Sequence, residues 1–340
     1  MAPSWSSRPP GGPLRAVTAW RHCRPPSRRT PVPSRAGRRP RRALTGVLAA
    51  AALALSGCIQ VADEPDPRPY VLTTFTVLAD IARRVAGDHL QVHSITKVGA
   101  EIHAYEPTPT DIRDTARADL VLDNGLGLET WFEQLTQDAD AEHVVVSEGV
   151  EPIDIASDEY AGKPNPHAWM SPTAAGVYVD TMARAFAELD PEHADEFAAN
   201  ARAYRAELDA VAADLREAVA AVPPAQRVLV TCEGAFSYLA RDAGLDEQYI
   251  WPVNAEQQAT PRQIRRTIEV VRERDVPAVF CESTVSDDPM RQVVEETGAR
   301  FGGTLYVDSL SEPDGPVPTY LELLRHDVDV IVAGLTEGPA

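Results

Sequence analysis

Two histidines and two acidic residues of this sequence stand where predicted strands give way to loops. His103 follows one strand, and His167 lies between a strand and a helix that begins with proline. Glu233 and Asp308 each end a predicted strand. Each residue alone has an ordinary explanation, such as a surface histidine, a helix start or a turn cap. Ligands of open α/β sheets bind beside the carboxyl ends of strands, and two imidazoles with two carboxylates form a complete ligand set for a divalent cation. Together the four residues predict a metal site.

Strands and helices alternate along the chain, which predicts an α/β fold built on parallel sheets. Short apolar runs indicate the strands, and apolar residues spaced by three and four indicate the helices. In the first half, these elements cover residues 70–75, 76–87, 90–96, 109–118, 119–125, 128–137, 143–148 and 171–190. In the second half, they cover residues 227–233, 235–244, 249–253, 260–275, 278–283, 288–298, 304–309 and 318–335.

A longer helix is predicted between the two halves, over residues 191–222. Its apolar positions step by three or four along one face and comprise Phe197, Ala201, Tyr204, Leu208, Val211, Leu215 and Val219. At 1.5 Å per residue this helix is more than about 40 Å long, which exceeds one small domain. We therefore expect two lobes, an N-terminal lobe at residues 70–190 and a C-terminal lobe at residues 223–340, joined by the helix.

Residues 1–57 differ from the rest of the chain. They contain eleven Arg and no Lys, Asp or Glu, and they include the apolar run 43–55 just before Cys58. Thirteen helical residues span about 20 Å, less than the roughly 30 Å of a bilayer core, so the run indicates a secretory signal. The motif LSGC at 55–58 resembles a bacterial lipobox, which predicts lipidation of Cys58 and an extracytoplasmic protein anchored to the cell membrane. Residues 58–69 form an acidic, proline-rich tether in this interpretation.

The charge of the chain changes when the leader is removed. Without residues 1–57, Lys plus Arg falls from 32 to 21 while Asp plus Glu stays at 51, a net charge of about −30. Such a charge argues against nucleic acid as a partner, because nucleic-acid binding requires a basic surface. Most of these carboxylates are expected to form a solvated surface, whose field favours cations only in a general way.

Outside the leader and the anchor, two cysteines remain, Cys232 and Cys281. An extracytoplasmic location permits a disulfide between them if the strands that carry them are neighbours. The alternative is a pair of buried, small apolar side chains. The residues alone leave this choice open.

Four segments resemble, in order, the ligand segments of the metal-binding lipoproteins of manganese, zinc and iron ABC importers, the cluster A-I solute-binding proteins. They are HAYEPTPTD at 103–111, NPHAWMSP at 165–172, TCEGAFSYLARDAGL at 231–245 and YVDS at 306–309. The resemblance covers about residues 70–338 and implies two α/β lobes joined by one long rigid helix, with metal bound between them. Carried over by motif, the metal ligands are His103, His167, Glu233 and Asp308. The resemblance also implies a monomer that delivers metal to a permease and its ATPase subunit.

Glu233 stands where zinc-type members of that family commonly carry histidine. Two neutral histidines and two carboxylates neutralise a dication, and carboxylates can raise the coordination number above four, which suits Mn²⁺ or Fe²⁺ better than tetrahedral Zn²⁺. The sequence also lacks a histidine-rich acidic insertion between residues 110 and 167, a feature of many zinc-type members. Zn²⁺ nevertheless binds such sites more tightly than Mn²⁺. A zinc-specific protein is therefore the alternative to the favoured Mn²⁺.

Three other classes of function compete with this interpretation. A metalloenzyme needs an open coordination position, which four protein ligands hardly leave, and the sequence has no HExxH or G-x-S-x-G motif. A surface adhesion lipoprotein is compatible with the anchor, but no partner patch is encoded. A two-lobed protein for siderophores or cobalamin would not need this ligand set. We therefore predict a binding protein and no enzyme, with ATP hydrolysis on a partner, since the chain lacks G-x-x-x-x-G-K-[ST].

Overall fold

The computed structural model describes residues 66–132, 135, 141–156, 160–253 and 259–336. The predicted leader, Cys58 and most of the predicted tether lie outside these residues. No helix in the described part of the chain combines the length and the apolar character needed to cross a bilayer.

The N-terminal lobe is built on one parallel sheet with the strand order β2-β1-β3-β4. Its strands are β1 (Tyr70–Thr73), β2 (Gln91–Ser94), β3 (Leu120–Asp123) and β4 (Glu142–Val145). Its helical elements are α2 (Thr76–Ala86), α3 (Pro109–Ala116), the 3-10 turn η2 (Ala168–Met170) and α5 (Pro172–Leu189). Every residue of β1 and β3 is buried, because these central strands are covered on both faces.

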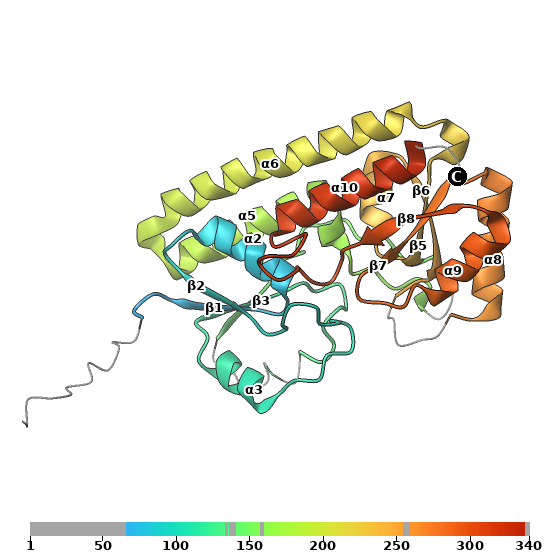
Figure 1. Ribbon diagram of the computed structural model, residues 1–340. Helices are drawn as coiled ribbons and strands as arrows, with labels where there is room; N and C mark the ends of the chain where they lie inside the picture. The colour runs from blue at the N-terminus through green and yellow to red at the C-terminus, as the bar shows by residue number, and fades with distance from the viewer. Residues whose placement is uncertain (1–65, 133–134, 136–140, 157–159, 254–258, 337–340) are drawn as a thin grey trace, which may run out of the picture. The chain divides into compact units, whose positions relative to one another are not determined.

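The C-terminal lobe contains two parallel strand pairs, β5-β6 and β7-β8. The strands are β5 (Val228–Glu233), β6 (Asp246–Trp251), β7 (Ala278–Glu282) and β8 (Arg300–Leu305). The helical elements are η4 (Pro224–Gln226), α7 (Ser237–Ala243), α8 (Pro261–Arg274), α9 (Asp288–Thr297) and α10 (Tyr320–Thr336). The Cα atoms of Cys232 in β5 and Cys281 in β7 lie 4.9 Å apart, so the two pairs are neighbours (Figure 1). The predicted α/β fold with parallel sheets is confirmed.

Local sequence signals explain where several helices begin and end. The sequence T-P-x-x-I-R occurs twice, and in both places its threonine and the residue three positions later form a capping box, at the starts of α3 and α8. The side chain of Ser171 likewise accepts the backbone N–H of Ala174 at the start of α5. Helices α7 and α9 end at Gly244 and Gly298, both in the left-handed conformation that glycine adopts without steric penalty.

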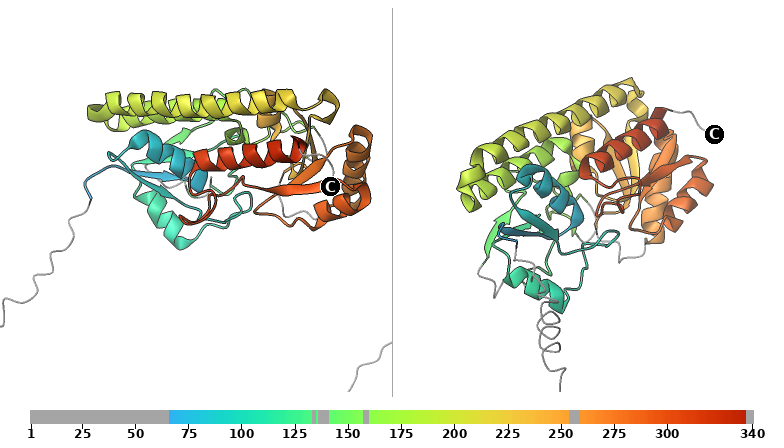
Figure 2. Two further views of the ribbon diagram at one scale, coloured as in Figure 1. Left: turned by 45° about the horizontal axis from the view of Figure 1, so that its top comes forward. Right: turned by 60° about the vertical axis from the view of Figure 1, so that its left-hand side comes forward.

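The long helix predicted between the lobes is present. It consists of a 3-10 turn, η3 (Pro191–His193), followed by the 28-residue α6 (Ala194–Ala221), which at 1.5 Å per residue is about 42 Å long. All seven residues of the predicted apolar face are buried. They pack in one hydrophobic core with residues of α2, α5, α7 and α10. Figures 1 and 2 show α6 alongside α5 of the N-terminal lobe and α10 of the C-terminal lobe. The lobe boundaries at residues 190 and 223 remain predictions.

Three predicted elements differ most from the structure, while other strands are up to three residues shorter at their ends. The strands expected over 249–253 and 304–309 begin three and four residues earlier, as β6 and β8, because pairing with β5 and β7 sets their extent. In the helix expected over 128–137, residues 128–132 are not helical, residue 135 is helical, and residues 133–134 and 136–137 lie outside the described residues. Before this segment the Glu129 carboxylate accepts the backbone N–H groups of Asn124 and Gly125 at 2.8 and 3.2 Å, which stabilises the turn after β3.

Candidate metal centre

His103 lies in a turn after β2, and its side chain is only 5% exposed. The carboxylate of Glu101 accepts the backbone N–H groups of His103 and Ala104 at 2.8 and 3.0 Å. The indole N–H of Trp131 donates to the carbonyl of Ile102 at 2.9 Å. These three bonds hold the turn in place, so the imidazole is presented with little freedom.

His167 lies just before η2 and is fully buried. The Oδ1 atom of Asn165 accepts both the backbone N–H of His167 and its Nδ1–H, each at 3.0 Å. Because Nδ1 carries the proton, the Nε2 lone pair is free to bind a cation. Asn165 also donates from Nδ2 to the carbonyl of Gly234 at 2.6 Å, which ties this loop to the C-terminal lobe.

Glu233 is the last residue of β5 and is 1% exposed. The chain passes closely beside β6 directly after it. A Cβ atom on Gly234 would lie 2.7 Å from the carbonyl oxygen of Pro252 and 2.8 Å from Cδ1 of Tyr249. The glycine is therefore required for β5 to end at this position with Glu233 directed out of the sheet.

Asp308 does not end a strand, contrary to the prediction. Strand β8 ends at Leu305, and Asp308 follows in a loop, where it is 1% exposed. The indole N–H of Trp169 donates to the carbonyl of Val307 at 3.1 Å, so the loop is anchored to η2 of the other lobe. Thr284 donates to Oδ2 of Asp308 at 3.0 Å, whereas Oδ1 has no hydrogen-bond partner among the described residues. A buried, unpartnered carboxylate oxygen is costly unless a ligand completes it.

The side chains of three predicted ligands converge on one point. The Nε2 atoms of His103 and His167 lie 3.1 Å apart, and Oε1 of Glu233 lies 3.5 and 3.8 Å from them. Two ligand atoms that each lie about 2.1 Å from one ion are about 3.0 Å apart when the ligand–ion–ligand angle is a right angle. They are about 3.4 Å apart when that angle is tetrahedral. The spacing of the three atoms therefore matches a shared divalent cation.

Asp308 belongs to an adjoining group that shares His103. Ligand atoms of Glu101, His103 and Asp308 all lie within 4.8 Å of one another. The ligand atoms of His103, His167 and Glu233 meet the same limit. The structure thus brings His103, His167 and Glu233 together and sets Asp308 beside His103. It adds a third carboxylate, Glu101, that the sequence had not singled out.

Burial determines the protonation of these side chains. It lowers the pKa of His103 to about 4 and that of His167 well below its usual value, so both imidazoles are neutral at pH 7, as metal ligands must be. Burial, with the nearby charge of Glu101, raises the pKa of Asp308 to about 7. Burial also raises the pKa of Glu282 to about 8. Clustered buried carboxylates of this kind favour a bound cation, whose charge reverses these shifts.

Sequence reasoning missed three residues that hold the ligands. Glu101 and Asn165 each precede a predicted histidine ligand by two positions and accept its backbone N–H. Glu282 accepts the backbone N–H of Glu233. The short spacing to a histidine could have pointed to Glu101 and Asn165, but Glu282 is far from Glu233 in sequence.

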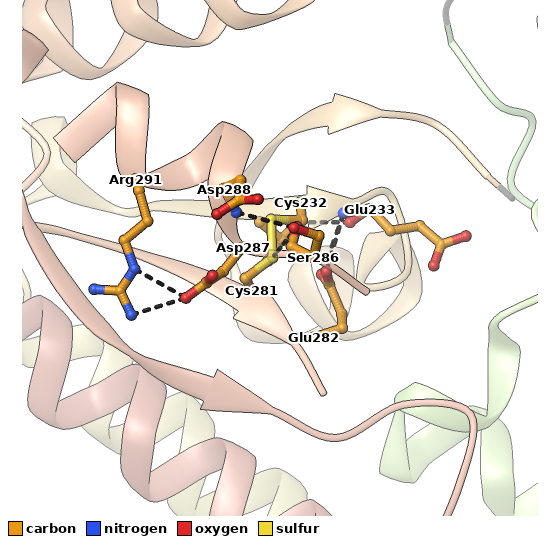
Figure 3. Close-up of a disulfide and its surroundings, with 9 residues drawn as sticks. Cys232, Glu233, Cys281, Glu282, Ser286, Asp287, Asp288 and Arg291 are labelled. Atoms are coloured by element: carbon orange, nitrogen blue, oxygen red, sulfur yellow. Dashed lines mark hydrogen bonds and ion pairs between the residues drawn. A yellow bond between two sulfur atoms is a disulfide. The ribbon is translucent and has the colours of Figure 1, made fainter. Parts of the chain in front are cut away.

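Cys232 and Cys281 form a disulfide bond, the first of the two possibilities left open by the sequence (Figure 3). Their sulfur atoms, together with Glu282, are close enough to resemble a metal cluster. Because both sulfurs are engaged in the disulfide, this group offers no thiolate to a metal.

Comparison with known proteins is consistent with this geometry. Residues 71–334 match the family described as zinc-uptake complex component A, periplasmic. The chain belongs to this family. It is 52% identical over 265 residues to the iron-binding protein YfeA of Yersinia pestis, covering 78% of this chain and 85% of that protein.

Two further members extend the comparison. The manganese ABC transporter substrate-binding lipoprotein PsaA of Streptococcus anginosus is 33% identical over 275 residues, covering 78% of this chain and 89% of PsaA. The Mn-bound periplasmic metal binding protein of Candidatus Liberibacter asiaticus superposes with a TM-score of 0.74 at 38% identity, covering 79% of this chain and 100% of that one. Members of the family are thus substrate-binding components of metal importers and not enzymes.

Proposed function

We propose that this protein captures a divalent metal ion outside the cytoplasm and delivers it to an ABC importer. The ion would be bound by His103, His167, Glu233 and Asp308. The observation that carries the proposal is the convergence of two imidazole nitrogens and one carboxylate oxygen at separations of 3.1 to 3.8 Å. The unpartnered oxygen of Asp308 beside His103 supports the fourth ligand.

Mn²⁺ is the favoured ion, with Fe²⁺ close to it in chemistry. The proposed ligands are two neutral imidazoles and two carboxylates, which together cancel the charge of a dication. Hard, oxygen-rich sites of flexible coordination number suit Mn²⁺ and Fe²⁺, and the relatives include one named for iron and one named for manganese. The alternative is zinc, which the family description names and which binds such sites more tightly in general.

The location and the partners follow from the family and from the leader. We propose that a lipid on Cys58 anchors a monomeric protein to the outer face of the cell membrane, as the lipoprotein name of PsaA suggests. The metal would pass to a permease, and an ATPase subunit would supply energy. Lobes at residues 70–190 and 223–340 would adjust about the helix at 191–222 during capture and release.

Metal analysis tests the proposal. The full-length protein, purified without chelator and reloaded with Mn²⁺ or Zn²⁺, should hold about one ion per chain. His103→Ala and Glu233→Ala should both lose it. His143→Ala is the matched control, because His143 pairs with Asp123 in β3 and not with the site. Absence of stoichiometric metal after reloading would overturn the ligand assignment and favour an organic ligand.

A further inference from the structure

The dipeptide Cys-Glu occurs at the ends of two neighbouring strands. Cys232 and Glu233 end β5, while Cys281 and Glu282 end β7. The cysteines are joined by the disulfide. The backbone N–H of Glu233 donates to both carboxylate oxygens of Glu282, at 3.3 and 3.2 Å. The two dipeptides are therefore joined twice, once by a covalent bond and once by a hydrogen bond (Figure 3).

The backbone N–H of Glu233 on the side facing β7 would usually donate to a backbone carbonyl of the neighbouring strand. The next N–H, that of Gly234, donates to the carbonyl of Trp251 in β6 at 3.0 Å. Successive N–H groups of a strand point to opposite sides, so the N–H of Glu233 faces β7. There it meets a glutamate side chain in place of a backbone carbonyl. Figure 3 shows the carboxylate of Glu233 pointing away from the disulfide and from Glu282.

Glu282 is 2% exposed, and burial of a carboxyl group is unfavourable unless its partners compensate. Its hydrogen bond to Glu233 constrains the residue whose side chain is a proposed ligand. The disulfide restrains the residue before it. Together they limit movement of the β5 end relative to β7, and so limit the positions open to the Glu233 carboxylate.

We propose that Glu282, supported by the Cys232–Cys281 disulfide, is a positioning residue that holds Glu233 ready for the metal ion. This inference rests on the proposed function. Residues that orient metal ligands through hydrogen bonds typically contribute about 10- to 100-fold to metal affinity. The effect should be greater for Mn²⁺ than for Zn²⁺, because Mn²⁺ depends more on carboxylate oxygens, whereas Zn²⁺ is bound strongly by imidazole.

The test is titration of the full-length protein with Mn²⁺ and Zn²⁺ by competition with a metal-sensitive dye. Glu282→Ala should weaken Mn²⁺ binding by about 10- to 100-fold, with a smaller loss for Zn²⁺. Glu282→Gln should stay within about threefold of the wild type, since its amide oxygen still accepts the N–H of Glu233. Asp119→Ala is the control: the Asp119 carboxylate also accepts a backbone N–H, that of Tyr70 at 2.7 Å, but it does so at the start of β1 and contacts none of the proposed ligands. That control should lose thermal stability and retain its metal affinity.

The outcomes separate this inference from the proposed function. If Glu233→Ala loses metal while Glu282→Ala binds Mn²⁺ like the wild type, the positioning role is wrong and the proposed function stands. If Glu233→Ala binds as tightly as the wild type, the ligand assignment itself is wrong.

If Glu282→Ala does not fold, two other proteins decide: Glu282→Gln, and the double variant Cys232→Ala with Cys281→Ala. Weaker Mn²⁺ binding in the disulfide-free protein, with retention in Glu282→Gln, supports the role, and unchanged binding without the disulfide overturns it.

Discussion

The two lobes supply proposed metal ligands of different charge and hold them in different ways. The N-terminal lobe offers His103 and His167 from loops, and the C-terminal lobe offers Glu233 from a strand end and Asp308 from a loop. The histidines are uncharged at neutral pH because burial lowers their pKa values. Burial of a neutral imidazole is less costly than burial of a carboxylate. Hydrogen-bonded loops are therefore sufficient in one lobe, whereas the other adds a disulfide beside its ligand.

The sheets of the two lobes also differ in how their strands are linked. In the N-terminal lobe four strands form a continuous parallel ladder. In the C-terminal lobe the pairs β5-β6 and β7-β8 are bridged by the disulfide and by the bond from Glu233 to Glu282. Where the strand ladder is less continuous, covalent and side-chain links take over part of its role. Substitutions in each lobe can test this difference.

Removal of the disulfide should produce the largest effect. The bonded cysteines are 49 residues apart, and a closed loop of that size corresponds to about 4 kcal/mol of stability in the chain-entropy description. Cys232→Ala with Cys281→Ala should lower the free energy of unfolding by roughly 2 to 4 kcal/mol in urea denaturation. A reductant should lower the urea midpoint of the wild type to about that of the variant, and it should leave the midpoint of the variant unchanged. A loss below about 1 kcal/mol would show that the disulfide does not stabilise this lobe.

Removal of the amide that orients His167 should have the next largest effect. In Asn165→Ala, the histidine loses the acceptor of its Nδ1–H and the link to Gly234. Mn²⁺ affinity should fall by about 10- to 100-fold in a dye-competition titration. Asn200→Ala is the control, because that amide donates to the carbonyl of Val85, at the end of α2. Equal affinity in the two variants would show that loop contacts alone orient the histidine.

Replacement of one carboxylate ligand tests the charge difference between the lobes. Glu233→His leaves three imidazoles and one carboxylate. Such a set carries one negative charge and does not cancel the two positive charges of the ion. Mn²⁺ affinity should fall at least about tenfold, or 1.4 kcal/mol, relative to Zn²⁺ affinity. The ratio of the two dissociation constants is the measurement, with His167→Ala as a control that should lose both ions. An unchanged ratio would contradict a charge-based preference for Mn²⁺.

A separate prediction concerns pH and the buried carboxyl of Glu129. Burial, with the charge of Asp123, raises the pKa of Glu129 to about 8, above its usual value near 4.5. The unfolded chain therefore loses this proton at lower pH than the folded protein, so the contribution of Glu129 is complete below about pH 4.5 and is lost as pH rises toward 8. The free energy of unfolding can fall by at most about 1.4 kcal/mol per pH unit through this one group. Glu129→Gln should show a smaller decline in melting temperature between pH 5 and 8 than the wild type. Parallel pH profiles for the two proteins would refute the assignment.

Sequence reasoning was most successful where the signal is local. The apolar spacing of the long helix predicted its buried face because a helix repeats every 3.6 residues whatever surrounds it. The helices predicted to begin at residues 109, 171 and 260 begin at Pro109, Pro172 and Pro261, because a helix start depends on a cap that bonds to residues two or three positions away. The histidine and glutamate motifs named residues whose side chains the structure brings together, because each motif lies at a strand end or loop that the chain places on the same side.

The tertiary structure decided what depends on contacts between distant segments. The end of β8, and hence the position of Asp308 in a loop, follows from pairing with β7 and not from the apolar run itself. The disulfide requires β5 and β7 to be neighbours, and the bond from Glu233 to Glu282 links residues 49 positions apart. The sequence by itself determined which side chains are available for metal chemistry and where the long helix buries its apolar face. Only the folded chain decided which backbone groups hold those side chains, because burial and hydrogen bonding between remote strands exist only after the lobes have assembled.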